Sequence, residues 1–392
     1  MNPAGEEPRE QGDGVRHDGR DAPAPSRAQV VVCIGPGGVG KTSTSAALAL
    51  LAAREGARAC VVTIDPARRL ADALGISSVG NEPSRVPPPA GQSWAGELWA
   101  VMLDAQQTFD ELVSRYATSE GQAAAIRANP VYRNLSSALS GTQEYMAVEK
   151  LFELQESGLY DLIVVDTPPA QHALDFMEAP RHLARLLDNR VFRMLMVPTR
   201  VGLRALEMGA QLMLRTIAKV AGGQVVTDTV QFFTEFEGME AGFRARAQRA
   251  DELLHSSQAR FVLVCSPRRD TVEEALFLAS QLRHEGLAVA SVVVNRCYPR
   301  FDAVPEDVAD ALREEGLGGV VANLADLRAV GEKEEQQLAR VRSFLPEALV
   351  LRVPLLFTEV TDVVSLAELA GHLSGAPAAG APAAGAPAAG GS

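Results

Sequence analysis

Short runs of aliphatic residues alternate with longer amphipathic segments along most of the chain. Most of these runs are continuous in Val, Ile and Leu, which is typical of parallel strands that are covered on both faces. They lie at residues 30–34, 59–64, 98–103, 161–165, 261–265, 288–295 and 349–353. Because helix-like segments separate them, we predict right-handed crossovers and an α/β fold with a doubly wound, mostly parallel sheet.

Two stretches are too long and too helical to be simple crossovers. Residues 104–158 and 181–258 lack good strand candidates, and we expect them to form a helical subdomain inserted above the sheet. In the second stretch, apolar residues recur at helical spacing. They are Leu203, Leu206, Ala210, Met213, Ile217 and Val220, followed by Phe232, Phe236, Met239 and Phe243. Such faces can accept varied hydrophobic partners, but for any single residue we favour packing within the subdomain's own core.

The composition changes at both ends of the chain. Residues 1–28 are rich in Gly, Pro and charge, and residues 375–392 repeat Gly-Ala-Pro-Ala-Ala. Neither composition can bury enough apolar surface to offset the entropy of ordering. We therefore expect two disordered tails around one folded domain at residues 29–374.

The overall charge and hydropathy exclude several classes of protein. A net charge of −12 argues against a nucleic-acid-binding surface, which is normally basic. No apolar run approaches the roughly 18 residues that a membrane span needs, and the N-terminus lacks the apolar core of a signal peptide. We expect a cytoplasmic protein without stable membrane insertion. The four cysteines are widely spaced and form no C-x-x-C pair, which predicts structural roles rather than zinc or disulfide bonding.

The clearest motif follows the first aliphatic run. It reads Gly35-x-x-x-x-Gly40-Lys41-Thr42 between a strand-like and a helix-like segment, which is the context of a phosphate-binding loop. Backbone N–H groups of such a loop form an anion-binding concavity at the positive end of a helix dipole. Lys41 is expected to reach the β- and γ-phosphates, and Thr42 to bind Mg²⁺. The residues expected to contact nucleotide here are Gly35, Gly37, Gly38, Val39, Gly40, Lys41, Thr42 and Ser43.

Two acids at strand ends supply the other parts of a hydrolytic site. Asp166 ends a buried run and has the context of a carboxylate that holds Mg²⁺ or its water ligands. Asp65 follows the second run, at the carboxyl end where α/β proteins bind ligands. A carboxylate there can orient or deprotonate the attacking water, although it can also cap the following helix. Asn295 ends a later run, and its amide can read an adenine edge. The guanine-reading pattern Asn-Lys-x-Asp is missing, so we expect ATP.

Together these motifs resemble the arsenical pump-driving ATPase family, which includes the targeting ATPases for tail-anchored membrane proteins. The resemblance covers about residues 29–373. Its specific parts are residues 37–42, the Asp-Pro-Ala motif at 65–73, Asp-Thr-x-Pro from Asp166 with His172, and Val-Asn at 294–295. It implies that Asp65 is the catalytic acid of the first switch and that Asn295 contacts adenine. A later segment around Pro354 resembles the family's adenine-side loop.

The chain also departs from the family pattern. Family members carry a lysine directly after the first loop glycine, which reaches across a dimer interface, and here that position is Pro36. We therefore expect a dimer, either a homodimer in which another cation of the same chain substitutes or a heterodimer with a lysine-bearing paralogue, and we favour the heterodimer. The cysteines that bind arsenite or zinc in relatives have no counterpart, so the residues do not support an arsenic function.

The favoured function is a Mg²⁺-dependent ATPase whose nucleotide state switches a dimer and its helical subdomain to bind or release a hydrophobic protein client. One alternative is a non-catalytic ATP-binding regulatory subunit, which Pro36 suggests. Another is a positioning ATPase, but those that act on membranes or DNA usually need an amphipathic helix or a basic face.

Overall fold

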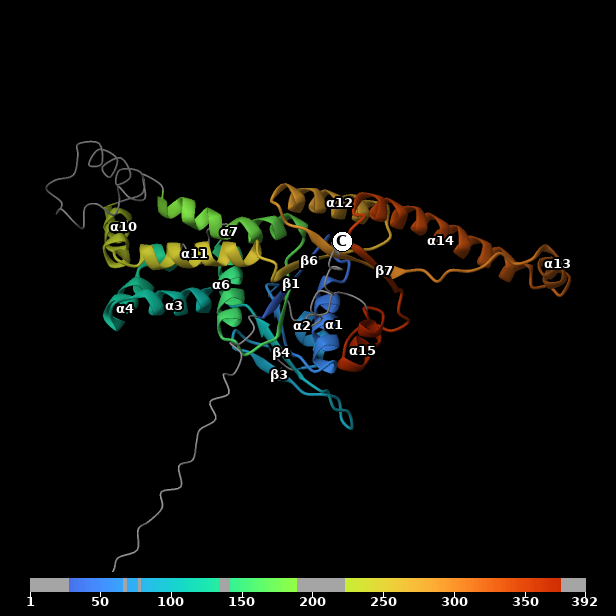
Figure 1. The fold of residues 1–392 in the computed structure, drawn as a ribbon, viewed down its shortest axis with the longest axis horizontal. Coiled ribbons are helices and arrows are strands. Elements are labelled where there is room, and N and C mark those ends of the chain that lie inside the picture. The colour runs from blue at the N-terminus through green and yellow to red at the C-terminus, as the bar shows by residue number, and fades with distance from the viewer. Residues whose placement is uncertain (1–27, 66–68, 77–78, 134–141, 189–222, 375–392) are drawn as a thin grey trace, which may run out of the picture.

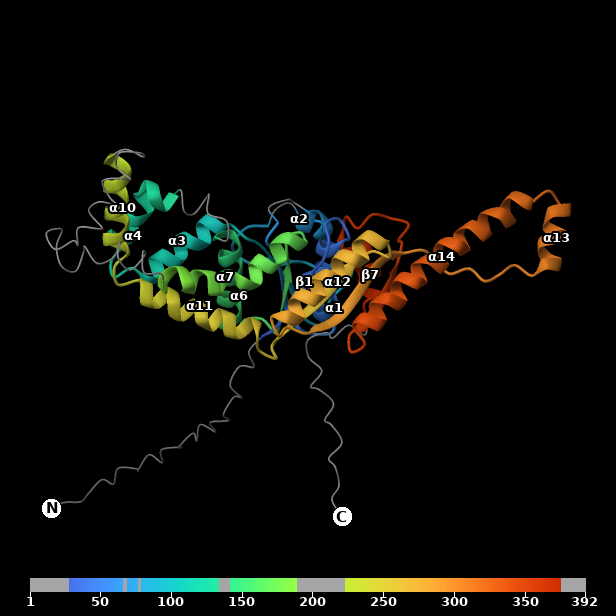
Figure 2. The ribbon, with the colours of Figure 1, turned by 90° about the horizontal axis from the view of Figure 1, so that it is seen from above.

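The fold was analysed in a computed structural model of the chain. The structure describes residues 28–65, 69–76, 79–133, 142–188 and 223–374. The apolar series between Leu203 and Val220, and the methionines Met194, Met196, Met208 and Met213, lie outside these residues. Figures 1 and 2 show a central sheet, a group of helices at one end and a helical hairpin that projects from the other end.

A single eight-stranded sheet forms the centre of the molecule, in the order β3-β4-β2-β5-β1-β6-β7-β8. All neighbouring strands are parallel except β3, which pairs antiparallel with β4 at the edge. The strands are β1 Gln29–Ile34, β2 Arg58–Thr63, β3 Ser84–Val86, β4 Glu97–Met102, β5 Leu162–Asp166, β6 Ala259–Cys265, β7 Val289–Cys297 and β8 Leu349–Pro354. Every aliphatic run that predicted a strand forms one, which confirms the doubly wound α/β fold.

Helices cover both faces of this sheet, and each face has its own core. In β1, Val30, Val32 and Ile34 belong to one apolar core, whereas Val31 and Cys33 belong to the other. One face carries α1, α2 and α15, and the opposite face carries α12 and α14 (Figure 1). These helices are α1 Lys41–Arg54, α2 Arg69–Leu74, α12 Arg269–His284, α14 Gly318–Phe344 and α15 Val363–Gly371. All four cysteines are free and buried.

The helical region lies beside the sheet, and its aromatic residues continue the apolar core of one sheet face. Its helices are α3 Ala105–Tyr116, α4 Glu120–Ala128, α6 Thr142–Glu156, α7 Ala170–Asp188, α10 Gly223–Phe236 and α11 Glu240–Leu254. Phe232, Phe236, Met239 and Phe243 are each at most 6% exposed. These residues do not lie on one helix, because the chain turns at Gly238 between α10 and α11. They therefore form the core of this region, which was the interpretation favoured from the sequence.

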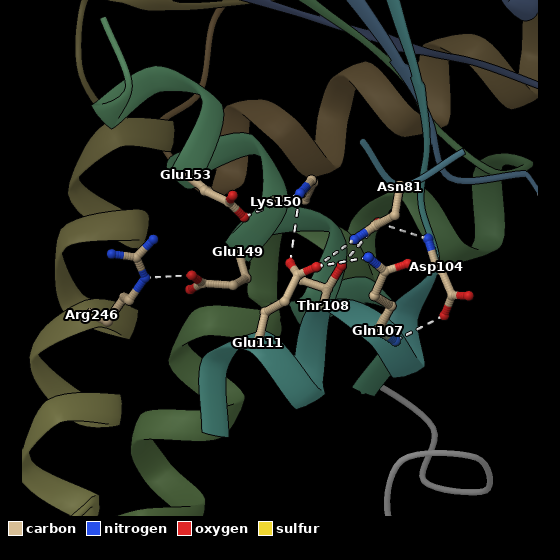
Figure 3. Close-up of polar contacts among 9 residues, drawn as sticks. All are labelled: Asn81, Asp104, Gln107, Thr108, Glu111, Glu149, Lys150, Glu153 and Arg246. Carbon is tan, nitrogen blue, oxygen red and sulfur yellow. Dashed lines mark hydrogen bonds and ion pairs between the residues drawn. The ribbon is translucent and has the colours of Figure 1, made fainter. Parts of the chain in front are cut away.

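Buried charges join three helices of this region (Figure 3). Arg246 on α11 forms an ion pair with Glu149 on α6, and both side chains are at most 3% exposed. The neighbouring Lys150 pairs with Glu153 at 3.3 Å and with Glu111 of α3 at 3.7 Å. The helical region is thus held by specific charge pairing in addition to its apolar core.

The connection between β7 and β8 contains a projecting hairpin that the aliphatic pattern did not predict. It consists of α13 Glu306–Glu314 and α14. The buried residues of α14, Glu334, Leu338 and Val341, all lie in its C-terminal half, and the buried residue of α13 is Ala309. The rest of the hairpin extends away from the sheet (Figures 1 and 2). Among the described residues, no helix has the length and apolarity that crossing a bilayer requires.

Candidate nucleotide-binding site

The phosphate loop joins β1 to α1 and fits its place only because certain positions are glycine. A Cβ on Gly35 would lie 2.0 Å from the carbonyl oxygen of Val264, and one on Gly40 would lie 2.4 Å from Nδ2 of Asn295. Gly40 also has a φ of 95°, in the left-handed region that favours glycine. It precedes α1 without a side-chain capping hydrogen bond. Because Gly40 has no side chain that could cap them, the first N–H groups of α1 remain available to bind an anion.

Lys41 folds back over this loop. Its Nζ donates to the carbonyl oxygens of Gly35, at 3.0 Å, and of Pro36, at 2.8 Å. Burial lowers the pKa of Lys41, and among the described residues no carboxylate lies within ion-pair distance of it. The ammonium group is thus held at the loop by neutral acceptors, which phosphate oxygens would replace with stronger charge-assisted bonds.

Asp166 lies at the end of β5, directly beside the start of α1. Its Oδ2 accepts hydrogen bonds from Thr42 Oγ1 at 2.8 Å and from Thr63 Oγ1 at 2.9 Å. Its Oδ1 is buried and has no hydrogen-bond partner among the described residues. Burial raises the pKa of Asp166 to about 6, against the lowering effect of these two hydroxyl groups.

This arrangement fits a Mg²⁺ ion. Mg²⁺ prefers oxygen ligands and is usually held by one or two carboxylates together with water and substrate phosphates. The unpartnered Oδ1 of Asp166 and the hydroxyl of Thr42 are oxygen ligands of this kind at the head of the loop. No cluster of three or more His, Cys, Asp or Glu that could hold a metal was found in the described part of the chain. Any Mg²⁺ here would take its remaining ligands from water and from phosphate oxygens.

Asp65 follows β2 at the same edge of the sheet. Its Oδ2 forms an ion pair with Arg69 Nη1 at 3.1 Å, and its backbone N–H donates to Thr63 Oγ1 at 3.3 Å. Thr63 therefore contacts both predicted acids of the site, Asp65 and Asp166. The side chain of Asp65 is 24% exposed, so water can reach it. The start of the Asp-Thr-x-Pro segment is also beside the loop, since Thr167 Oγ1 donates to the carbonyl oxygen of Cys33 at 2.7 Å. The side chain of His172 lies outside what the structure describes.

Asn295, at the end of β7, binds the phosphate loop itself. Its Nδ2 donates to the carbonyl oxygen of Val39 at 2.9 Å, and its Oδ1 accepts from the backbone N–H of Arg296 at 2.9 Å. The predicted contact with adenine stays a prediction. Pro354 lies one strand farther from the loop, where β8 pairs with Cys297 of β7.

Arg296 is a further residue at the loop that was not predicted from the sequence. Its Nη1 donates to the carbonyl oxygen of Gly38 at 3.1 Å, so Asn295 and Arg296 bind two consecutive carbonyl groups of the loop. The available signal was its position, directly after an Asn that ends a strand near the loop.

Comparison with known proteins identifies relatives over most of the chain. The sequence profile of a family described as anion-transporting ATPase matches residues 28–375. The chain is 27% identical to ATPase GET3 of Malassezia globosa over 271 residues, which cover 69% of this chain and 73% of that protein. It is 24% identical to ATPase get3 of Botryotinia fuckeliana over 329 residues, covering 83% and 84%. A shorter match to an uncharacterized protein of Streptomyces coelicolor is 35% identical over 182 residues and covers 45% of this chain and 42% of that protein.

Proposed function

The chain belongs to the anion-transporting ATPase family, and on this basis we propose that it is a Mg²⁺-dependent ATPase that switches a helical region by binding and hydrolysing ATP. The observation that carries the proposal is the contact between Thr42 and Asp166 at the head of the phosphate loop. Within the described residues, one oxygen of this buried carboxylate has no hydrogen-bond partner, and the loop beside it leads into a helix N-terminus without a side-chain cap, which favours anion binding.

Each residue of the site has a separate task in this mechanism. The backbone N–H groups of the loop bind the phosphates, and Lys41 transfers its donors from the carbonyl oxygens of Gly35 and Pro36 to the β- and γ-phosphates. Thr42 and Asp166 would hold Mg²⁺ or its water ligands. When bound, the ion neutralises charge on the β- and γ-phosphate oxygens. Asp65 orients the attacking water and accepts its proton.

Phosphate release from Mg-ATP by the purified chain tests this function. We expect steady turnover by the natural chain and loss of nucleotide binding in Lys41→Ala, because the substitution removes the cation that stabilises the phosphates. Binding is measured by calorimetry and turnover by released phosphate. A natural chain that binds ATP tightly without releasing phosphate would favour the regulatory subunit instead. The presence of Lys41, Thr42, Asp65 and Asp166 favours catalysis.

We further propose that nucleotide state moves the helical region, which binds or releases a hydrophobic protein client. The loop after Asp166 leads directly into α7, and α7 packs against both α6 and α11. A shift of this loop is therefore passed to the region's core without an intervening flexible linker. The two GET3 relatives are described only as ATPases, so the hydrophobic nature of the client is our own inference from the apolar residues of the sequence between 194 and 220.

Hydrogen exchange tests this switch. We expect protection of residues 190–250 to differ between ADP and a non-hydrolysable ATP analogue, because α10 and α11 follow the movement of α7. The Lys41→Ala variant is the control and should give the same exchange with either nucleotide. Identical protection of the natural chain in both states would contradict the switch, and these residues would then only pack the core of the helical region.

We also propose that the chain works as a dimer. Pro36 has no ammonium group and no backbone N–H, so it cannot contact a phosphate across an interface. Either a second copy or a lysine-bearing paralogue can serve as the partner. Which of them does so depends on where the missing positive charge comes from.

A further inference from the structure

The backbone at the end of β7 leaves the regular strand to present one side chain to the phosphate loop. The pairing of β7 with β8 shifts register between Val294 and Cys297, and Arg296 lies in this interval with a φ of 63°. It is the single non-glycine residue with a positive φ among those that the structure describes. Such a conformation is unfavourable for a residue with a side chain and persists where the surrounding contacts determine it. Here those contacts are with the loop.

The guanidinium group of Arg296 lies at the exposed rim of that loop. Its Nη1 donates to the carbonyl oxygen of Gly38, which is itself exposed, while the neighbouring Asn295 holds Val39. Within the described residues Arg296 forms no ion pair, whereas other arginines near it do. Arg300 pairs with Glu335, and Arg352 pairs with Glu334 and Glu335. Arg296 thus combines a full positive charge with a single neutral acceptor.

The phosphate loop carries less positive charge than a bound nucleoside triphosphate requires. Lys41 is the one cationic side chain between residues 29 and 53, and Pro36 provides neither a cation nor an N–H donor. A guanidinium group presents several donors in a planar fork that matches phosphate oxygens, and it remains charged throughout the physiological pH range. Exchange of the Gly38 carbonyl for a phosphate oxygen would replace a neutral hydrogen bond with a charge-assisted one.

We propose that Arg296 is a further phosphate-binding residue of the nucleotide site. Its guanidinium group leaves the Gly38 carbonyl to bind the triphosphate and supplies, from the same chain, the positive charge that Pro36 cannot. This inference rests on the proposed ATPase function and removes the need for a lysine-bearing partner.

Two substitutions separate the charge of Arg296 from its structural contacts. Arg296→Gly accepts the positive φ without strain but removes the guanidinium group, and Arg296→Gln keeps a neutral donor that can reach Gly38. Calorimetric affinities for Mg-ATP and Mg-ADP and steady-state turnover are measured on the full chain. We expect both variants to lose about 10- to 100-fold in Mg-ATP affinity, and less in Mg-ADP affinity, because a hydrogen bond to a charged group is lost. Arg300→Ala is the matched control, since it removes an exposed arginine of the same segment, and should match the natural chain.

The outcomes distinguish this inference from the function on which it rests. A natural chain that neither binds nor hydrolyses ATP would overturn the function itself. An active natural chain with an unchanged Arg296→Gly variant would overturn only the role of Arg296. The same holds if Arg296→Gln binds Mg-ATP like the natural chain, because the contact with Gly38 would then suffice. Turnover that arises only after addition of a lysine-bearing paralogue would also overturn it, since the cation would then come from the partner.

Discussion

Asp65→Asn is expected to bind Mg-ATP about as tightly as the natural chain but to hydrolyse it about 10²–10⁴-fold more slowly, which is the contribution of one well-placed general base. The amide keeps the size of the side chain and can still contact water, but it cannot accept a proton. Because Asp65 is partly exposed and lies beside Thr63, which also binds Asp166, the effect should fall on the chemical step.

Single-turnover phosphate release, measured with saturating Mg-ATP, isolates that step from nucleotide exchange. Asp326→Asn is the control, because it removes an exposed carboxylate from the part of α14 that extends away from the sheet. Its turnover should equal that of the natural chain. Unchanged turnover in Asp65→Asn would contradict a catalytic role. Asp65 would then serve only to pair with Arg69 and to stabilise the start of the following helix.

Arg246→Met is expected to destabilise the fold by about 3–5 kcal/mol, because it leaves a buried carboxylate without its partner. Glu149 is 2% exposed, and burial raises its pKa. Arg246 also contacts Glu156 at 2.7 Å and lies 4.7 Å from the centre of the Phe152 ring. Removal of the guanidinium group therefore breaks contacts between α11 and α6 at the centre of the helical region (Figure 3).

Chemical denaturation monitored by circular dichroism measures this effect. The matched control is Arg249→Met, since Arg249 pairs with the same Glu156 but is 51% exposed. Exposed pairs contribute about 0–1 kcal/mol, so the control should lose little. The double variant Arg246→Met with Glu149→Leu should regain most of the lost stability, because it leaves no unpaired charge. Equal losses in Arg246→Met and Arg249→Met would contradict the buried pairing.

The sheet could be predicted from the sequence because its strands are buried on both faces and are therefore continuous in aliphatic residues. The prediction failed for β3, whose three residues, Ser84, Arg85 and Val86, lie at the edge and carry no such signal. It also missed the break after α10, because the spacing of Phe236, Met239 and Phe243 continues a helical pattern across Gly238. Burial in one core imposes that pattern on two helices as readily as on one.

The positions of the loop and of the two strand-end acids could be predicted for a different reason, whereas their roles in binding and hydrolysis stay predictions. Gly35, Gly40 and Lys41 are fixed by local geometry, and Asp65 and Asp166 by their positions at strand ends. The contact of Arg296 with Gly38 was not predictable, because it depends on a register shift between β7 and β8 that no local pattern encodes. The contact of Asn295 with the loop could not be predicted either, because the loop lies more than 250 residues earlier in the chain.

The projecting helix α14 makes the outer hairpin a mechanical lever. Its fulcrum lies near Glu334, which accepts a hydrogen bond from the backbone N–H of Tyr298, two residues beyond Arg296, at 2.9 Å. From this point to the tip at Gly318 the helix extends about 24 Å, at 1.5 Å per residue. A tilt of about 10° at the fulcrum would move the tip by roughly 4 Å over that arm. A rearrangement at the end of β7 that tilts α14 would thus displace the far end of the hairpin by several ångströms.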